Sequence, residues 1–449
     1  MTSTHRNGLL CVLLSMAISI IWGVAIGRGG NAWNDFRGIY AASRCLIHHH
    51  NPYSVGELTR EYMSEDGQRP PDKPEFLEAI VLCVNVPTTF VIVAPLAALS
   101  WGPAHILWML ATGSAFILAI VLMWNVGARS APRVSTFLAC ILAVNCEEIF
   151  AAGNAAGIAV ALCGIAVWCF IENRFVRLGV ACLGLGLAIK PHDAGFIWLY
   201  FLLAGGAYRR RALQSALVTA AIGLTAVLWV WHIAPHWLQD WNANLAAIST
   251  PGGINDPGPN SATGSSIYTV VDLQSAISVF RDDPRFYNIT GYLICGTLSL
   301  IWSIWTLRTR FTAHKAWFAL AAGTAFELLI TYHRPWDARL VMLAIPACCV
   351  LWARPGRLGK IAFLVTAAGV LFAGVLPLAS FKTLADFLRT TTAGFGAQLL
   401  TLLLRRPEPI ALLVMGVFYL WVYLTPEVQS ENTVASEAVL LGGAGNDQR

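Results

Sequence analysis

Long apolar stretches separated by short polar connectors make up most of the chain. About 20 consecutive apolar residues are enough for a helix to cross a bilayer, and shorter runs of this kind form buried helices. The pattern predicts an all-α, polytopic transmembrane bundle with about twelve crossings. The predicted helices lie near residues 9–27, 79–99, 104–126, 134–151, 155–171, 178–189, 194–206, 213–233, 289–307, 316–331, 338–352, 361–379 and 409–425, with a weaker one at 391–404.

Two long polar stretches interrupt this pattern, at residues 28–78 and 234–288. We interpret residues 1–430 as a single integral membrane domain that contains both, and residues 431–449 as a polar tail. The second stretch is rich in Pro and Gly, and loops of this length usually have a function. We hypothesise that this stretch closes over a bound acceptor substrate.

Composition supports a membrane protein. Of 449 residues, 56% are hydrophobic and only 12% are charged, about half the charged fraction of a typical soluble chain. A soluble protein is therefore excluded. The run at 9–27 could be a signal peptide, but it lacks a clear small-x-small cleavage site and is long enough to span, so we interpret it as a retained first helix.

The placement of basic residues predicts the orientation. Five connectors carry clusters of Arg and Lys, and the positive-inside rule assigns them to the cytoplasm. The stretches 28–78 and 234–288, together with short turns near residues 153, 190 and 333, are expected outside the plasma membrane. The basic connectors contain Arg129 and Arg133; Arg174 and Arg177; Arg209, Arg210 and Arg211; Arg308, Arg310 and Lys315; and Arg354, Arg357 and Lys360.

This orientation requires an odd number of crossings between residues 78 and 129, whereas the sequence offers two apolar runs. Pro87 and Pro95 interrupt the first run, and proline inside a helix removes a hydrogen bond and clashes with the preceding turn. We favour a broken or re-entrant segment at 79–99. The alternative is that Arg129 is an exception to the charge rule.

Candidate chemistry begins directly after the first predicted span. Phe36, Ile39 and Tyr40 share one face at helical spacing, which predicts a short interfacial helix that Asn51-Pro52-Tyr53 ends. Asp35 would lie at its N-terminus. An ordinary N-cap is one interpretation of Asp35, and a general base at the membrane boundary is another. The two roles are compatible.

Asp35-Phe36, Tyr40-Ala41-Ala42 and Asn51-Pro52-Tyr53 resemble the opening signature of glycosyltransferase family 87. Three later segments agree in order: Gly153-Asn154-Ala155-Ala156 is similar to a Gly-Gln-x-Asn turn, Gly184 to Pro191 is similar to a Gly-x-Ala…Lys-Pro element, and Tyr332 to Asp337 resembles a late His-containing turn. The resemblance covers roughly residues 9–350.

The resemblance implies a GT-C fold in which the first external loop supplies the catalytic base, Asp35. It also implies a polyprenyl-phosphate sugar as donor. Cations must then stabilise the leaving phosphate, and the candidates are Lys190, Arg334, Arg37 and Arg44. His192 and His333 are candidates for hydrogen bonds to sugar or phosphate oxygens. Further candidates, for the acceptor or the cavity wall, are Tyr40, Asn154, Asp193, Asp337 and Tyr268.

Each of these residues also has a purely structural interpretation. Lys190 could be a snorkelling lysine at a helix end, and His192 and His333 could be interfacial histidines. Asp337 could pair with Arg334 or Arg339, which we favour. Asn154 could belong to an ordinary helix-end turn.

We expect no essential metal and no cofactor besides the lipid-linked donor. The three residues His48-His49-His50 cannot all face one ion, because consecutive helical residues point about 100° apart. Asp282-Asp283-Pro284 is first of all a turn signal.

The leading hypothesis is an inverting membrane glycosyltransferase that moves a hexose, with mannose expected, from a polyprenyl-phosphate donor to a glycolipid or glycan acceptor on the external side of the plasma membrane. A pentose transferase or a glycan ligase would differ only in donor. A transporter or lipid-linked glycan flippase is the alternative from another class, and Glu327 inside an apolar run is its main support. Membrane lipids are expected partners and nucleic acids are not.

Overall fold

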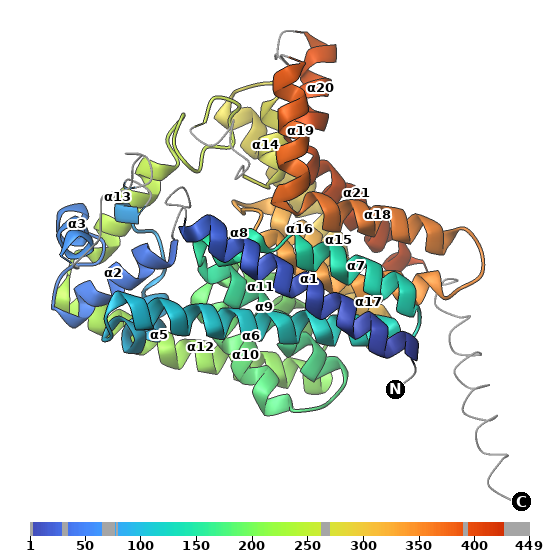
Figure 1. Cartoon of the computed structure of the whole chain (residues 1–449), viewed down its shortest axis with the longest axis horizontal. Coiled ribbons are helices and arrows are strands. Elements are labelled where there is room, and N and C mark those ends of the chain that lie inside the picture. Colours follow the sequence, from blue (N-terminus) through green and yellow to red (C-terminus); the bar gives the residue numbers. More distant parts are fainter. Residues whose placement is uncertain are drawn as a thin grey trace, which may run out of the picture.

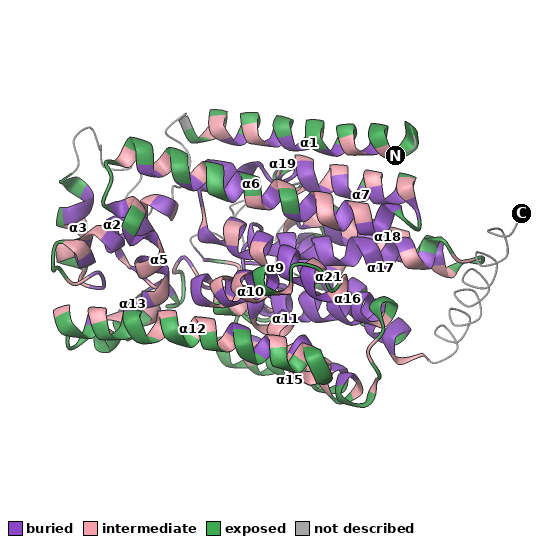
Figure 2. Ribbon diagram, turned by 90° about the horizontal axis from the view of Figure 1, so that it is seen from below, coloured by how far each residue is buried: buried purple, intermediate pink, exposed green. Residues whose placement is uncertain are grey.

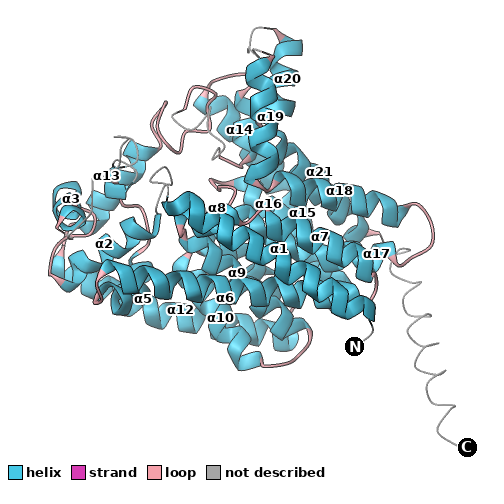
Figure 3. Ribbon diagram, viewed as in Figure 1, coloured by secondary structure: helices cyan, strands magenta, loops and turns pink. Residues whose placement is uncertain are grey.

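The computed structural model describes residues 3–28, 35–64, 77, 80–261, 270–388 and 394–425, and these residues form helices and loops without a β-strand (Figure 3). The all-α prediction is confirmed. Every predicted apolar run coincides with one helix or with two consecutive ones. The chain folds into a bundle of roughly parallel and antiparallel helices, with shorter helices at the left and at the top of the view (Figure 1).

The first half of the chain supplies the helices that frame the site. The 79–99 run is only partly helical, because the helix starts at Pro87, a favoured first position for proline. Their bounds are α1 Ser3–Arg28, α2 Asp35–Ile47, α3 Val55–Met63, α5 Pro87–Ala97, α6 Trp101–Ala128, α7 Pro132–Val144, α8 Glu147–Ala152, α9 Ala155–Ile171, α10 Val176–Ile189, α11 Pro191–Leu203 and α12 Gly206–Ile233.

The second half adds the long polar segment and the remaining bundle helices. The stretch predicted as a loop at 234–288 contains two helices of its own, α13 and α14, and the first turn of a third. The bounds are α13 Trp237–Ile248, α14 Leu273–Ser278, α15 Pro284–Arg308, α16 Ala313–Ile330, the 3₁₀ helix η1 Asp337–Leu343, α17 Ala344–Trp352, α18 Leu358–Phe372, α19 Val375–Phe387, α20 Phe395–Arg405 and α21 Pro407–Leu424.

Six helical segments are long and apolar enough to cross a membrane, and α18 with α19 could form a seventh span that is bent by 79°. The twelve crossings expected from sequence are therefore not confirmed, because the other apolar runs form helices too short to meet this criterion. The six are Ser3–Gly27, Trp101–Ala128, Pro132–Ala152, Gly206–Ile233, Pro284–Arg308 and Pro407–Leu424.

The length of helix α5 helps to decide how many times the chain crosses the membrane between residues 78 and 129. Its 11 residues reach about 16 Å at 1.5 Å per residue, roughly half the hydrocarbon thickness of a bilayer. This length agrees with a re-entrant segment. Tyr53 of the first polar stretch packs against Phe90 of α5, and the Tyr40 hydroxyl donates a hydrogen bond to the Leu99 carbonyl directly after it.

Burial separates a central group of helices from a rim. Helices α9, α16 and α17 are almost entirely buried, whereas α1, α12 and α15 turn long apolar faces outward (Figure 2). Only 11% of the α12 span is buried inside the protein, against 72% of the Pro132–Ala152 span. Exposed leucines such as Leu217 and Leu228 on α12 fit contact with lipid, because water would disfavour such a surface.

The polar connectors divide between the two ends of the bundle. At one end Arg129 pairs with Glu172, and Arg211 donates to the Asn173 side chain. At the other end Asn51 of the first polar stretch donates to Asp240 of the second. These contacts of the basic connectors and of the polar stretches are separate from one another, and the side of the membrane that each set faces stays a prediction.

Candidate active site

The site is centred on a break between α10 and α11. Pro191 disfavours the helical conformation at the preceding residue, and Lys190 accordingly leaves the helix with φ −142° and ψ 88°. Proline then serves as the first residue of α11, where its missing N–H costs nothing. The break places Lys190 between two helix ends and Asp193 in the first turn of α11, where the helix dipole favours a carboxylate.

Two threonines of α5 hold this break in place. The Thr88 hydroxyl donates to the Ala188 carbonyl, and the Thr89 hydroxyl donates to the Ile189 carbonyl at 3.0 Å. These carbonyls belong to the last turn of α10 and have no partner further along a continuous helix. Sequence reasoning missed both threonines, because the partners lie 100 residues apart.

The segment between α16 and η1 supplies the second half of the site. Asp337 begins η1, and one of its oxygens accepts the Arg334 backbone N–H at 2.7 Å. Its other oxygen accepts a hydrogen bond from Lys190. The sequence-based preference for an ion pair at Asp337 named Arg334 or Arg339 as partner, whereas the structure places Lys190 there.

Lys190 faces two buried carboxylates. Its Nζ also lies 3.7 Å from Oδ2 of Asp193. Burial alone would lower the pKa of Lys190, but Asp193 and Asp337 raise it above its ordinary value. Burial raises the pKa of Asp337, yet Lys190, followed by the nearby histidines, holds that pKa below its usual range. The pair is therefore ionised.

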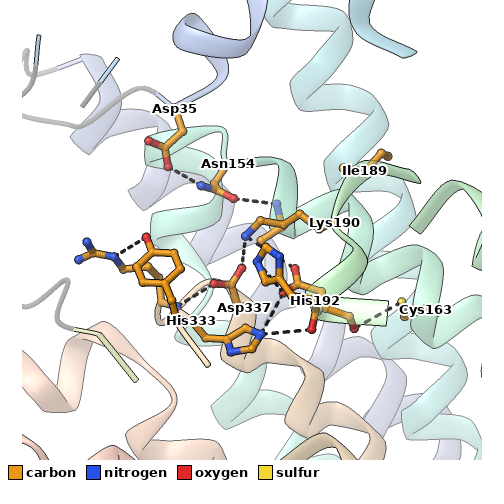
Figure 4. A network of polar contacts seen from close by, with 12 residues as sticks. Asp35, Asn154, Cys163, Ile189, Lys190, His192, His333 and Asp337 are labelled. Carbon is orange, nitrogen blue, oxygen red and sulfur yellow. Dashed lines mark hydrogen bonds and ion pairs between the residues drawn. The ribbon is translucent and has the colours of Figure 1, made fainter. Parts of the chain in front are cut away.

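His192 and His333 come together beside this pair. Their ring centroids are 5.2 Å apart, and each Nε2 lies within 3.7 Å of the Asp193 carboxylate. Burial, the Lys190 charge and the facing ring lower the pKa of His192, and burial lowers that of His333. Both imidazoles are therefore neutral near pH 7. Figure 4 shows the two rings converging below Lys190.

Asp35, from the first polar stretch, lies near the group formed by Lys190 and its neighbours. It is the first residue of α2, as the sequence predicted. Nδ2 of Asn154 donates to its Oδ2 at 2.5 Å. The Asn154 side-chain oxygen accepts the Ala156 N–H at 2.7 Å and so caps α9. Because that oxygen is used in the cap, the amide group must point its N–H toward Asp35.

The turn before Asn154 depends on Gly153. This residue ends α8 with φ 62°, a left-handed conformation that glycine adopts without strain. A Cβ on Gly153 would also lie 3.0 Å from the Cβ of Phe36. The Gly-Asn pair thus brings the α8–α9 turn against the start of α2.

The environment of Asp35 tunes its acidity. Burial raises its pKa to about 6, against the lowering effects of the Asn154 hydrogen bond and of the Lys190 and Arg334 charges. A carboxylate with this pKa is ionised at neutral pH and binds a proton more strongly than an ordinary aspartate. Both properties suit a general base.

Arg334 lies at the site, but its side chain already donates hydrogen bonds to neighbouring residues. Its guanidinium donates to the Tyr332 hydroxyl at 2.8 Å and to the Ile254 carbonyl at 2.7 Å. It therefore fastens the second polar segment onto the site. Sequence reasoning proposed Arg334 for the donor phosphate and did not find this role.

Arg37, Arg44 and Tyr40 have contacts elsewhere. Arg37 stacks over the rings of Tyr62 and Trp101, and Arg44 pairs with Glu61 at 2.9 Å. Arg44 also donates to the Tyr40 hydroxyl. These described contacts lie within the first polar stretch and the start of α6, and Tyr268 lies outside the described residues.

An apolar cavity of about 450 Å³ lies next to the Asp35 end of the site, between α1 and α6. His105 lines it and also stacks against Phe36, the residue after Asp35. From there the lining follows α6 to Ile117, about 18 Å along the helix axis. The cavity thus runs along α6 into the apolar zone of the bundle from His105, which contacts the residue after Asp35. Its wall consists of Ile20, Val24, Gly27, His105, Ile106, Met109, Leu110, Gly113, Ser114, Ile117, Phe150 and Ala151.

The arrangement combines four chemical elements. It has a base with a raised pKa, a buried ammonium, two neutral imidazoles and a neighbouring apolar cavity. These are the groups needed to deprotonate a hydroxyl, to stabilise an anionic leaving group and to hold a lipid chain.

The model of glycosyltransferase family 87 matches residues 84–332, more than half of the chain. The matched part includes Asn154 and Lys190, begins after Asp35 and ends one residue before His333. No curated protein matches the chain.

Proposed function

Because the chain belongs to glycosyltransferase family 87, and is therefore a membrane glycosyltransferase, we propose that it moves a hexose from a polyprenyl-phosphate sugar to a glycolipid or glycan acceptor. Mannose is the hexose we propose first. The reaction takes place at the face that carries the two polar stretches, which is the external face of the plasma membrane. The family match favours this reaction over transport.

One observation carries the proposal: the partly buried Asp35, with a pKa of about 6, is held by Asn154, and the next residue, Phe36, contacts His105 in the wall of an apolar cavity. Asp35 accepts the proton of the acceptor hydroxyl while that oxygen attacks the anomeric carbon. In-line attack inverts this carbon, so a β-linked donor yields an α-linked product. Asn154 keeps the carboxylate oriented during the transfer.

The leaving group of such a donor is a lipid phosphate, and its charge grows as the glycosidic bond breaks. Lys190 is the best-placed cation for this oxygen, because its position between α10 and α11 is fixed by Asp337 and Asp193. A preorganised cation in a site with little water stabilises developing charge strongly. His192 and Asp337 would contact the sugar or the acceptor.

The cavity between α1 and α6 supports a lipid-linked donor. Its lining is apolar, and α1 is packed loosely enough that only 22% of its span is buried. We propose that the first isoprene units of the donor lie there, with the phosphate at the His105 end. A nucleotide sugar has no lipid chain that could occupy this cavity.

The test is a membrane assay with radiolabelled polyprenyl-phosphate mannose. We expect the wild-type protein to form a labelled glycolipid or glycan, and Asp35→Asn to lower the rate at least about 100-fold, the scale of a lost general base. Asp386→Asn is the matched control, because Asp386 is exposed. Full activity in Asp35→Asn would remove this residue from the mechanism.

A second arm tests the cavity. Gly113→Phe fills it, whereas Leu107→Phe changes an exposed residue of the same helix. We expect the first variant to raise KM for long-chain donors more than for short-chain ones, and the second to change neither. Absence of transfer from every lipid-linked sugar, combined with movement of a substrate across vesicles, would instead favour the transporter.

A further inference from the structure

Three side chains that could ligate a metal meet beside Lys190. His192 and Asp193 stand in the first turn of α11, and His333 approaches from the segment after α16. Oδ1 of Asp193 lies 3.7 Å from Nε2 of His192 and 3.6 Å from Nε2 of His333. One ligand atom from each residue falls within 4.8 Å of the other two.

The carboxylate at the centre is unsatisfied. Asp193 is fully buried, and neither of its oxygens accepts a hydrogen bond from the part of the chain that the structure describes. Leaving a buried carboxylate without hydrogen bonds is costly, and such groups are normally paired or bound to a metal. The nearest ammonium, Lys190, is shared with Asp337.

The hydrogen bonds of His333 determine which nitrogen is available. Each nitrogen of the ring lies near a backbone carbonyl oxygen, Nδ1 at 2.9 Å from Thr331 and Nε2 at 3.3 Å from His192. The shorter contact favours the tautomer of the neutral ring with its proton on Nδ1, which leaves the Nε2 lone pair on the side of Asp193. Metal-ligating histidines characteristically donate their other N–H to a carbonyl or carboxylate in this way.

Nε2 of His192 is the third atom of the group. It too is buried and has no hydrogen-bond partner among the described residues. Two imidazole nitrogens and one carboxylate therefore face one small volume. Lone pairs on all three groups would repel one another unless a positive charge lay between them.

The distances to Asp193 are close to those around a first-row divalent cation. Bonds of 2.0–2.1 Å in a tetrahedral site separate neighbouring ligand atoms by about 3.3 Å. The two edges to Asp193 therefore need to contract by a few tenths of an ångström, and the edge between the two imidazoles, which is at most 4.8 Å long, by up to about 1.5 Å. Two imidazole nitrogens and one carboxylate oxygen, with a fourth position open, form a donor set that zinc takes in catalytic sites.

We propose that His192, Asp193 and His333 bind one divalent cation of the zinc type. The His192 side chain is 36% exposed although its Nε2 is buried, so the site lies close to a surface from which a water molecule or a substrate oxygen would approach the fourth position. This inference revises the expectation that no metal is essential, which considered only His48-His49-His50 and Asp282-Asp283.

A role for the cation rests on the proposed function. A cation at this position would lie beside Lys190, on the side of the site where the lipid phosphate leaves. It would act as a Lewis acid on a phosphate oxygen and so add to the charge that Lys190 supplies. Binding of the cation itself is independent of that role and can be measured without substrate.

The experiment measures metal content of the full chain in detergent. The purified protein is stripped with a chelator, dialysed, incubated with Zn²⁺ and analysed by mass spectrometry of the metal, and Co²⁺ serves as a spectroscopic probe of tetrahedral coordination. We expect one equivalent of Zn²⁺ and visible cobalt absorption. Asp193→Asn and His333→Ala should each weaken binding by more than about 100-fold, because even outer residues of metal sites account for 10–100-fold.

His236→Ala is the matched control, since His236 is an exposed histidine at the same end of the bundle. Circular dichroism and size-exclusion profiles identify variants that do not fold, and Asp193→Glu keeps a carboxylate and should retain cobalt absorption in altered form. Binding of less than about 0.1 equivalent by the wild type, or equal binding by wild type and Asp193→Asn, overturns the proposal. The first result would mean that Asp193 shares a proton with an imidazole instead.

The outcomes separate the metal site from the transferase proposal. Stoichiometric zinc without transfer from any lipid-linked sugar would leave the site standing and refute the proposed function. Full transfer by a protein that binds no zinc would refute the metal site and leave the proposed function standing.

Discussion

Replacing Asn154 by serine tests how the ionisation of Asp35 is controlled. Asn154 does two things with one side chain: its oxygen caps α9, and its N–H₂ group donates to Asp35. Serine is as good an N-cap as asparagine, but its hydroxyl is too short to hold both contacts. Asn154→Ser therefore removes the donor to Asp35 and keeps the cap.

The size of the effect follows from the strength of this bond. A hydrogen bond to a charged group contributes about 1.5–3 kcal/mol, and 1.36 kcal/mol corresponds to a pKa change of one. The Asn154 bond lowers the pKa of Asp35, so its loss raises that pKa from about 6 to about 7–8. A base is active when ionised, so activity rises as the pH passes the pKa of Asp35. The variant, in which this pKa is higher, reaches full activity only at a higher pH.

The assay is the pH dependence of kcat/KM between pH 5 and 9, with labelled lipid-linked donor in membranes. We expect the acidic limb of the wild type to fall near pH 6. Asn154→Ser should be about 5- to 50-fold slower at pH 6 and nearly equal at pH 9, as expected for a base with the raised pKa. Asn154→Ala should show the same limb and also lose about 1 kcal/mol of stability with the cap.

Two results would refute this reasoning. If the limb of Asn154→Ser coincides with that of the wild type while its thermal midpoint is unchanged, the amide does not set the ionisation of Asp35. If the wild type shows no limb near pH 6, Asp35 is not the titrating base.

Three further substitutions test the packing around the site by thermal midpoints in detergent and by transfer rate. Gly153→Ala places a side chain at φ 62° against Phe36, so we expect a loss of about 1–2 kcal/mol and reduced transfer, whereas Gly102→Ala, which meets nothing within 4 Å, should change neither. Lys190→Met leaves the buried, ionised Asp337 without its ammonium and should cost about 3–5 kcal/mol; an unchanged midpoint would contradict the ion-pair assignment. Arg339→Met should cost a similar amount by stranding the buried Glu148, and adding Glu148→Gln should recover part of it, whereas additive losses would argue against the pair.

Much of the fold could be predicted from the sequence, because apolar periodicity and proline mark helices locally. The start of α2 at Asp35 and its end before Asn51 followed from such signals. The number of crossings did not, because several apolar runs give helices too short to span. Whether a short helix crosses depends on how it packs, and no local pattern contains that information.

The site was predictable residue by residue but not as an arrangement. Lys190, His192 and Asp193 stand out in the sequence, and so does His333. Their convergence depends on a contact over 141 positions. Arg44 shows the same limit: the sequence proposes it for the donor phosphate, and only the folded chain shows that Glu61 lies 2.9 Å from its guanidinium.

The threonine anchors at the α10–α11 break carry a consequence for sequence variation. Pro191 leaves the carbonyls at the end of α10 without helical partners, and Thr88 and Thr89 of α5 satisfy them. If α10 continued without the proline, its own N–H groups would bond these carbonyls and the threonine hydroxyls would not be needed. If the hydroxyls were absent, the carbonyls would have no hydrogen-bond donor. We therefore expect the proline and the threonine pair to be inherited as a unit, and any attempt to graft this site onto another scaffold to fail unless α5 is transferred with it.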